Sequence, residues 1–212
     1  TRLVGSEMCI RDRYSMCGRF REAEIILKSI KTSELPRDLL INYYQTYSSF
    51  WGHYSISVAN NLYGKQQSAY QDSLFALIDH TSWDYRMSQA SYYIWRDTLK
   101  SKEIFKELLD IEEVGTPNYA MITHSYSRLC HHQKKYDEEK KYLILSAIAD
   151  TRNATRENAS LQSLALIQYE EKNLADAFKF TQSAIDDVIS SGIHFRAIEI
   201  YKFCLLYTSP SP

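Results

Sequence analysis

The feature that most restricts the fold of this chain is a helical spacing of apolar residues that is rarely interrupted. Between residues 14 and 203, Pro36 and Pro117 are the only prolines, and no stretch alternates apolar and polar residues for long. Apolar positions three and four residues apart are typical of helices, whereas strands need turn residues more often. The sequence therefore predicts an all-α fold.

The same spacing predicts ten helices joined by short linkers, which favour antiparallel packing of successive helices. Thr116 is suited to cap a helix that begins with Pro117, and Ser82 to cap another. Gly115 and Gly192 lie where one helix ends and the next begins, as left-handed termination prefers. The predicted helices cover residues 18–31, 37–57, 65–79, 83–96, 99–113, 117–133, 136–150, 155–171, 174–190 and 193–203.

One pattern of residues recurs along the chain, with copies that begin at Gly18, Tyr136 and Leu174 and a fainter copy at Leu99. The anchors Leu99, Tyr136 and Leu174 lie 37 and 38 residues apart. A small residue followed four positions later by a larger one is the core of the pattern. The positions expected to pack the repeats are Gly18, Phe20, Ala23, Leu27, Tyr136, Leu143, Ala147, Leu174, Ala177 and Ala184.

This spacing resembles the second helix of the tetratricopeptide repeat (TPR), in which a small residue lets paired helices approach closely. The match is degenerate, because Glu139 and Lys102 occupy the small position and the aromatic-Leu-Gly signature of the first TPR helix is absent. The resemblance implies TPR-like antiparallel helical hairpins stacked in a right-handed superhelix. An irregular helical bundle is the alternative.

Residues 142–161, 174–178, 185–187 and 194–200 resemble blocks typical of a narrower family. That family is the TPR-containing transcriptional regulators of Bacteroidota, of the type called domain of unknown function 6377. The resemblance implies a longer protein with a signal peptide, a periplasmic repeat region, one transmembrane helix, a coiled coil and a cytoplasmic DNA-binding tail. This chain would be a fragment covering most of the periplasmic region, linked to the membrane only through flanking regions that it lacks.

The two ends of the chain can be encoded by one DNA sequence read in opposite directions. Codons for residues 8–12, reversed, complemented and read one frame over, specify residues 204–208. Such strings resemble adapters joined to sequencing fragments. We therefore expect residues 1–13 and 204–212 to be adapter-like tails, and residues 14–203 to form a TPR-like domain truncated at both ends.

Charge argues against a nucleic-acid interface in this chain. The formal net charge is −1 and no basic stripe is present, whereas binding to phosphate backbones needs clustered Lys and Arg.

Cys17 and Cys130 lack metal-ligand spacing, and the adjacent His131 and His132 point in different directions on a helix. We therefore expect no metal, no cofactor and two unpaired thiols.

No pattern of residues predicts catalysis. Phosphate-binding glycine loops and the HExxH and GxSxG motifs are absent, and no Ser, Cys or Thr nucleophile has an evident partner base. Acidic runs such as residues 137–139 are typical of solvated helix faces rather than catalytic pairs. We therefore expect a protein that is not an enzyme.

Aromatic residues are concentrated in the first hundred positions. Tyr43, Tyr47, Phe50 and Tyr54 are spaced as the buried seam of a long helix. Aromatic residues off that seam could line a concave groove, because Tyr and Trp bind apolar or sugar surfaces at low entropy cost. The candidate groove residues are Tyr44, Trp51, Tyr92 and Trp95.

A polar group surrounds the predicted helix junction after residue 150. Capping and ion pairing are the expected roles, and such contacts could fix the angle between hairpins. Its members are Asp150, Arg152, Arg156 and Glu157.

These observations favour an interaction module that binds a protein or small ligand in a concave groove and passes a signal to a membrane-linked regulator. The periplasmic location follows from the family resemblance alone. The alternative is a TPR-based glycan-binding protein of the outer-membrane starch-binding type. The aromatic residues favour that alternative, and the short linkers count against it. Oligomeric state stays open.

Overall fold

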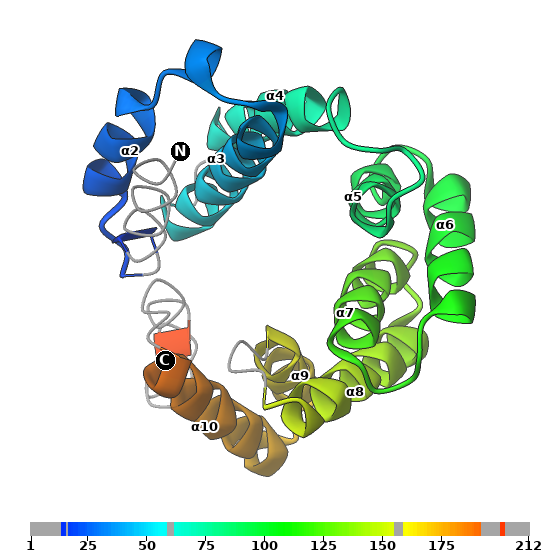
Figure 1. Ribbon diagram of the computed structural model, residues 1–212. Helices are drawn as coiled ribbons and strands as arrows, with labels where there is room; N and C mark the ends of the chain where they lie inside the picture. Colours follow the sequence, from blue (N-terminus) through cyan, green and yellow to red (C-terminus); the bar gives the residue numbers. More distant parts are fainter. Residues whose placement is uncertain (1–13, 16, 59–61, 155–158, 192–199, 202–212) are drawn as a thin grey trace. The chain divides into compact units, whose positions relative to one another are not determined.

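Consecutive antiparallel helices make up the computed structural model of this chain (Figure 1), which describes residues 14–15, 17–58, 62–154, 159–191 and 200–201. No strand occurs within these ranges, so the predicted all-α fold is confirmed. The α-helices are α2 (Phe20–Ser29), α3 (Arg37–Val58), α4 (Leu62–Phe75), α5 (Trp83–Tyr93), α6 (Thr98–Ile111), α7 (Pro117–His132), α8 (Tyr136–Arg152), α9 (Ala159–Glu170) and α10 (Leu174–Ser191), and a 3-10 helix, η1, covers Thr32–Glu34.

The described residues divide into two compact units, the first ending at His80 and the second beginning at Thr81. In the first unit, α2 and α4 both pack on α3. Tyr47 on α3 stacks on Tyr70 of α4 with ring centroids 4.4 Å apart. Phe20 of α2 meets Phe50 of α3 edge to face at 6.0 Å. Each such ring pair adds about 0.5–1.5 kcal/mol beyond the area that it buries, so aromatic contacts hold this unit together.

The predicted aromatic seam of α3 is confirmed. Tyr43, Tyr47 and Phe50 are buried, and Tyr54 is half-buried against the same cluster. Burial raises the pKa of the Tyr47 phenol far above its ordinary value, because the ionised ring would lie in an apolar setting.

The described part of the second unit contains three hairpins, α5–α6, α7–α8 and α9–α10, and each hairpin packs on the next. Figure 1 shows α5, α7 and α9 on one side of this stack and α6, α8 and α10 on the other. The main core joins the first two hairpins through Phe105, Leu108, Ile122 and Leu129, all fully buried. Packing of each hairpin on the next is the arrangement expected of helical repeats.

Helix starts follow the caps that the sequence predicts. Thr116 Oγ1 accepts a hydrogen bond from Tyr119 N at 3.1 Å, with Pro117 at the first helical position. Ser82 Oγ accepts one from Tyr85 N at 3.2 Å. Gly115 adopts a left-handed φ of +91°, but α6 ends earlier, at Ile111, with the extended residue Glu112 as its C-cap, so the predicted left-handed helix termination at Gly115 is wrong. Gly192 lies outside the described residues.

Several boundaries differ from the predicted ranges. The helix expected over 83–96 ends at Tyr93, where Ile94 N bonds to Ser91 O and Arg96 N to Tyr93 O in tighter turns, and Asp97 then caps α6. The helix expected over 65–79 runs from Leu62 to Phe75. The described part of the helix expected over 155–171 is α9, and the one expected over 193–203 lies almost wholly outside the described residues.

Three of the described helices are followed by left-handed residues that are not glycine, one of them Ala154 after α8, with a φ of 52°. Lys134 and Lys172 have φ values of 58° and 61°. After α7, Lys134 N bonds to His131 O at 2.8 Å and Lys135 N to Cys130 O at 2.9 Å. After α9, Lys172 and Asn173 repeat the same pair of bonds. This pairing is the Schellman motif, so both turns use the geometry that glycine adopts most easily.

Lys134→Gly should stabilise the protein by about 0.5–1 kcal/mol, because relief of the left-handed strain at this position exceeds the entropy that glycine adds to the unfolded chain. The matched control is Lys135→Gly, at a neighbouring position with a φ of −96°, where glycine adds entropy without relieving strain. Urea unfolding checks both variants. A midpoint for Lys134→Gly at or below that of the unmodified protein would contradict the prediction.

Candidate functional site

The repeat positions are mostly buried, with consistent exceptions. Ala23, Leu27, Leu143, Ala177 and Ala184 are almost fully inaccessible to solvent, and Phe20 and Ala147 are also buried. Gly18, in contrast, is exposed, with a φ of +75°. Tyr136 and Leu174, the first residues of α8 and α10, are 59% and 54% exposed. In α8 and α10, the buried contacts of the repeat therefore begin one turn inside the helix.

Glu139 stands where the repeat pattern expects a small residue, and it is only 8% exposed. Its two carboxylate oxygens lie 3.1 and 3.0 Å from Nδ1 of His131, across the α7–α8 turn. A carboxylate is costly to bury without a partner. The His131 contact therefore explains how the closely packed position accommodates Glu139. The sequence interpretation of residues 137–139 as a solvated run is wrong for this residue.

The His131–Glu139 pair forms part of the wall of a pocket of about 450 Å³ in the second unit. The pocket lies among the end of α7, the first turn of α8 and the part of α9 from Ser163 onward. Apolar and acidic side chains share its lining. The lining residues are His131, Tyr136, Asp137, Glu139, Ser163, Leu166, Ile167, Glu170 and Glu171.

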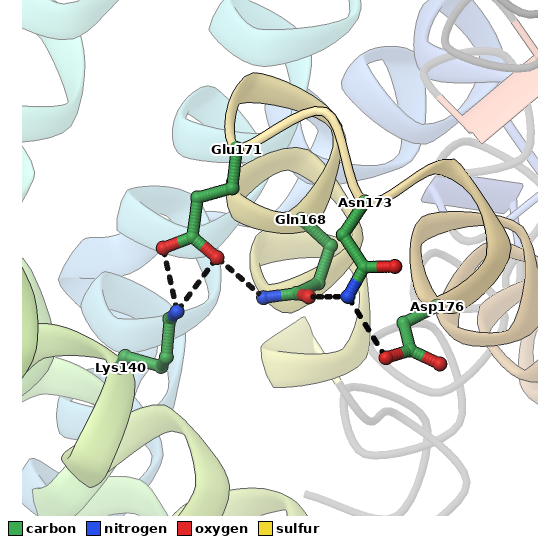
Figure 2. A network of polar contacts seen from close by, with 5 residues as sticks. All are labelled: Lys140, Gln168, Glu171, Asn173 and Asp176. Atoms are coloured by element: carbon green, nitrogen blue, oxygen red, sulfur yellow. Dashed lines mark hydrogen bonds and ion pairs between the residues drawn. The ribbon is translucent and has the colours of Figure 1, made fainter.

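A polar network borders this pocket and joins the two hairpins (Figure 2). Lys140 Nζ on α8 bonds to both carboxylate oxygens of Glu171, at 2.6 and 2.7 Å. Gln168 donates to Glu171 at 2.9 Å and accepts from Asn173 at 2.8 Å. Asn173 also donates to Asp176 Oδ2 at 2.9 Å. These bonds connect α8 to the α9–α10 turn and hold one edge of the pocket in place.

A chain of hydroxyl groups crosses the contact between the same two hairpins. Ser146 Oγ donates to Ala120 O at 2.9 Å, and Ser160 Oγ donates to Ser146 Oγ at 2.9 Å. His124 Nδ1 lies 3.0 Å from Ser160 Oγ. Each hydroxyl has one proton, so Ser160 must accept from His124, which places a proton on Nδ1. The chain therefore links α7, α8 and α9 through three side chains.

The four candidate groove residues are divided between the two units, with Tyr44 and Trp51 in the first and Tyr92 and Trp95 in the second. Trp51 belongs to the core of the first unit, where it stacks on Tyr63 at 5.3 Å, so its assignment to a groove is wrong. Tyr44 is half-buried and packs against the same core. In the second unit, Tyr92 is half-buried with the Arg96 guanidinium 3.8 Å from its ring centre. Trp95 is 56% exposed, with its ring 4.6 Å from that of His132.

The polar group at the α8 end is described only in part, because Arg156 and Glu157 lie outside the described residues. Asp150 is half-buried and Arg152 is exposed. Asn153, directly after α8, joins the end of this helix to the loop before α7. Its side chain donates to Gly115 O at 2.6 Å and to Ala149 O at 2.7 Å. Sequence reasoning missed this role. An asparagine directly after a helix, opposite a turn that contains glycine, is the signal that could have shown it.

Comparison with known families decides what kind of repeat this is. The family model described as the SusR N-terminal TPR domain matches residues 2–202. The chain belongs to this family. Neither the curated proteins nor the solved structures include a match. The antiparallel helical hairpins of this chain are the fold expected of a SusR-type TPR domain.

Neither a metal site nor a membrane span is found in the described part of this SusR-type domain. No group of three or more metal-binding side chains occurs among the described residues. None of the described helices is long and apolar enough to cross a membrane.

The two cysteines in the described ranges are both free thiols, with Cys17 exposed and Cys130 buried. Burial, together with the nearby Glu138 carboxylate, raises the pKa of Cys130 to about 11. Because only the thiolate reacts with alkylating reagents, Cys130 carries far less reactive thiolate than an ordinary thiol at pH 8.

We expect iodoacetamide at pH 8 to label Cys17 at least about 100-fold faster than Cys130, from the lower thiolate fraction and the buried position. The difference should persist until pH rises through the raised pKa of Cys130. Peptide mass spectrometry after timed quenching measures both rates, and Cys17 serves as the internal reference. Equal rates in the folded protein would contradict the burial of Cys130.

Proposed function

We propose that this TPR domain is a non-catalytic module that binds a protein or small ligand, and that it is the periplasmic sensor region of a membrane-anchored transcriptional regulator. The observation that carries the proposal is a partly apolar pocket set between two hairpins of a chain that belongs to the SusR N-terminal TPR domain family. Pockets of this size suit small ligands or single side chains of a partner.

The position of the pocket suits a sensor. Its lining comes from α7 and α8 of one hairpin and α9 of the next. A ligand that contacts both hairpins would favour one angle between them, which is how differential binding shifts a conformational equilibrium. Because each hairpin packs on the next, a small change at one junction is transmitted along the stack.

Protease accessibility in cells of the source bacterium tests the location. In spheroplasts that retain the inner membrane, we expect added protease to remove the TPR domain while a cytoplasmic marker survives. An antibody against the hairpins detects the loss. Protection of the domain until the inner membrane is lysed would contradict the periplasmic assignment.

Glycan binding is the second candidate, and the exposure of Trp95 favours it, since an exposed indole face suits sugar rings. Trp95→Ala should then weaken binding of a maltooligosaccharide in isothermal titration by about tenfold, within the range for an aromatic anchor. The half-buried Trp83 supplies the control, as Trp83→Phe should leave the affinity unchanged. Absence of binding by the unmodified domain would remove this candidate.

A further inference from the structure

We propose that the pocket of the second unit binds a lysine or arginine side chain of a protein partner. The inference rests on the proposed interaction function and names the chemistry of its partner. It follows from an acidic rim around an apolar floor, with charges that the protein itself leaves uncompensated.

The four carboxylates of the pocket differ in their partners. Glu139 is paired with His131, and Glu171 is paired with Lys140 and Gln168. Asp137 and Glu170 also line the pocket. Neither has a hydrogen-bond or ion-pair partner among the described residues. Two negative charges thus remain for a ligand to neutralise, and a cationic group is favoured over a neutral or anionic one.

The rest of the lining is apolar. Tyr136 and Leu166 are large hydrophobic residues that stay substantially exposed, and Ile167 is half-buried beside them. Lysine and arginine have aliphatic stems that cover apolar surface while the charged end reaches polar groups. A floor of Tyr136, Leu166 and Ile167 with Asp137 and Glu170 at the rim matches both parts of such a side chain.

The exposed floor residues favour a peptide as the source of this side chain over a free amine. A single ammonium ion would neutralise the rim and leave the exposed Tyr136 and Leu166 surfaces uncovered. Apolar residues that flank a lysine or arginine in a peptide would cover these surfaces and add to the affinity. The partner is therefore expected to present a basic residue between apolar ones.

Nuclear magnetic resonance titration of the full chain with acetyl-Leu-Lys-Leu-amide tests the proposal. We expect chemical-shift changes at the amides of the pocket residues, and binding that weakens as ionic strength rises to about 0.3 M. The same peptide with norleucine or glutamate in place of lysine should bind at least about fivefold more weakly, as loss of a rim ion pair predicts. n-Butylammonium should bind more weakly than the lysine peptide.

Asp137→Asn and Glu170→Gln should each weaken binding of the lysine peptide about threefold, and together about tenfold. Glu138→Gln is the matched control, because it removes one charge from the same helical turn but Glu138 does not line the pocket. The affinity of the Glu138→Gln variant for the lysine peptide should stay within about twofold of that of the unmodified protein. This result separates the effect of contacts in the pocket from the effect of net negative charge.

The outcomes separate the two proposals. Equal binding of the norleucine peptide, or no effect of Asp137→Asn with Glu170→Gln, would overturn the cationic assignment and leave an interaction module with an apolar pocket. Equal binding of n-butylammonium would overturn the assignment to a protein partner. Absence of pocket shifts with every probe would also overturn the inference, while the location and regulatory role are tested independently in spheroplasts.

Discussion

Ala177→Trp should destabilise the protein by about 3 kcal/mol, the upper end of the cost of overpacking a close contact. Ala177 is 0% exposed and lies where α10 packs on α9. Thr181 Oγ1 donates a hydrogen bond to Ala177 O at 2.7 Å, so the backbone carbonyl of Ala177 is bonded to a side chain one turn later in the same helix. An indole has no space at this position, and the two helices must separate to admit it.

Thermal unfolding followed by circular dichroism at 222 nm is the measurement, and the expected loss is about 6–12 °C for a chain of this size. Ala175→Trp provides the matched control, since Ala175 is exposed two residues earlier in the same helix. It should leave the midpoint within about 2 °C, as surface substitutions do. If the two variants melted together, the assignment of Ala177 as the close-contact position of the repeat would be wrong.

Ser160→Ala should cost about 1–3 kcal/mol, because it removes the acceptor of one donor and the donor of one acceptor in the hydroxyl chain. Ser146 would keep its bond to Ala120 O but lose the proton that Ser160 donates, and His124 Nδ1–H would lose its acceptor. The nitrogen chemical shifts of the His124 ring should change as well, since Ser160 fixes its tautomer. Urea unfolding and histidine side-chain spectra measure the two effects.

Ser163→Ala is the control for Ser160→Ala, because Ser163 bonds only to Ala159 O of its own helix, at 3.5 Å, among the contacts found in the described residues. Its expected effect is within about 0.5 kcal/mol. The double variant Ser146→Ala with Ser160→Ala should lose less than the sum of the single losses, because the two hydroxyls share one bond. Strict additivity would show that the hydroxyl chain does not act as a unit.

Local signals in the sequence predicted the helices well. Thr116 and Ser82 cap helices through their own neighbours, so no tertiary information was needed. The left-handed Lys134 was not predictable in the same way. Lysine has no preference for the left-handed region. The turn is recognised from the hydrogen bonds of Lys134 N and Lys135 N, which are visible in the structure and not in the sequence.

The site was harder to predict because it depends on contacts between elements. Trp51 lies off the seam of Tyr43 and Tyr47, yet it is buried because α3 is covered by both α2 and α4. A helix between two partners buries a wider arc than one stripe. Glu139 is buried only because His131 reaches it across a turn. Neither packing partner can be identified from the spacing of residues alone.

The central proposal is that this SusR-type TPR domain is the sensor of a membrane-anchored regulator. The DNA on either side of its coding segment tests this proposal most directly. Sequencing the genomic DNA on both sides of the coding segment in the source organism is the measurement. The account predicts a signal peptide upstream, and a transmembrane helix followed by a DNA-binding domain downstream, in one open frame. A stop codon soon after the codon for Phe203, or a catalytic domain in that position, would contradict it.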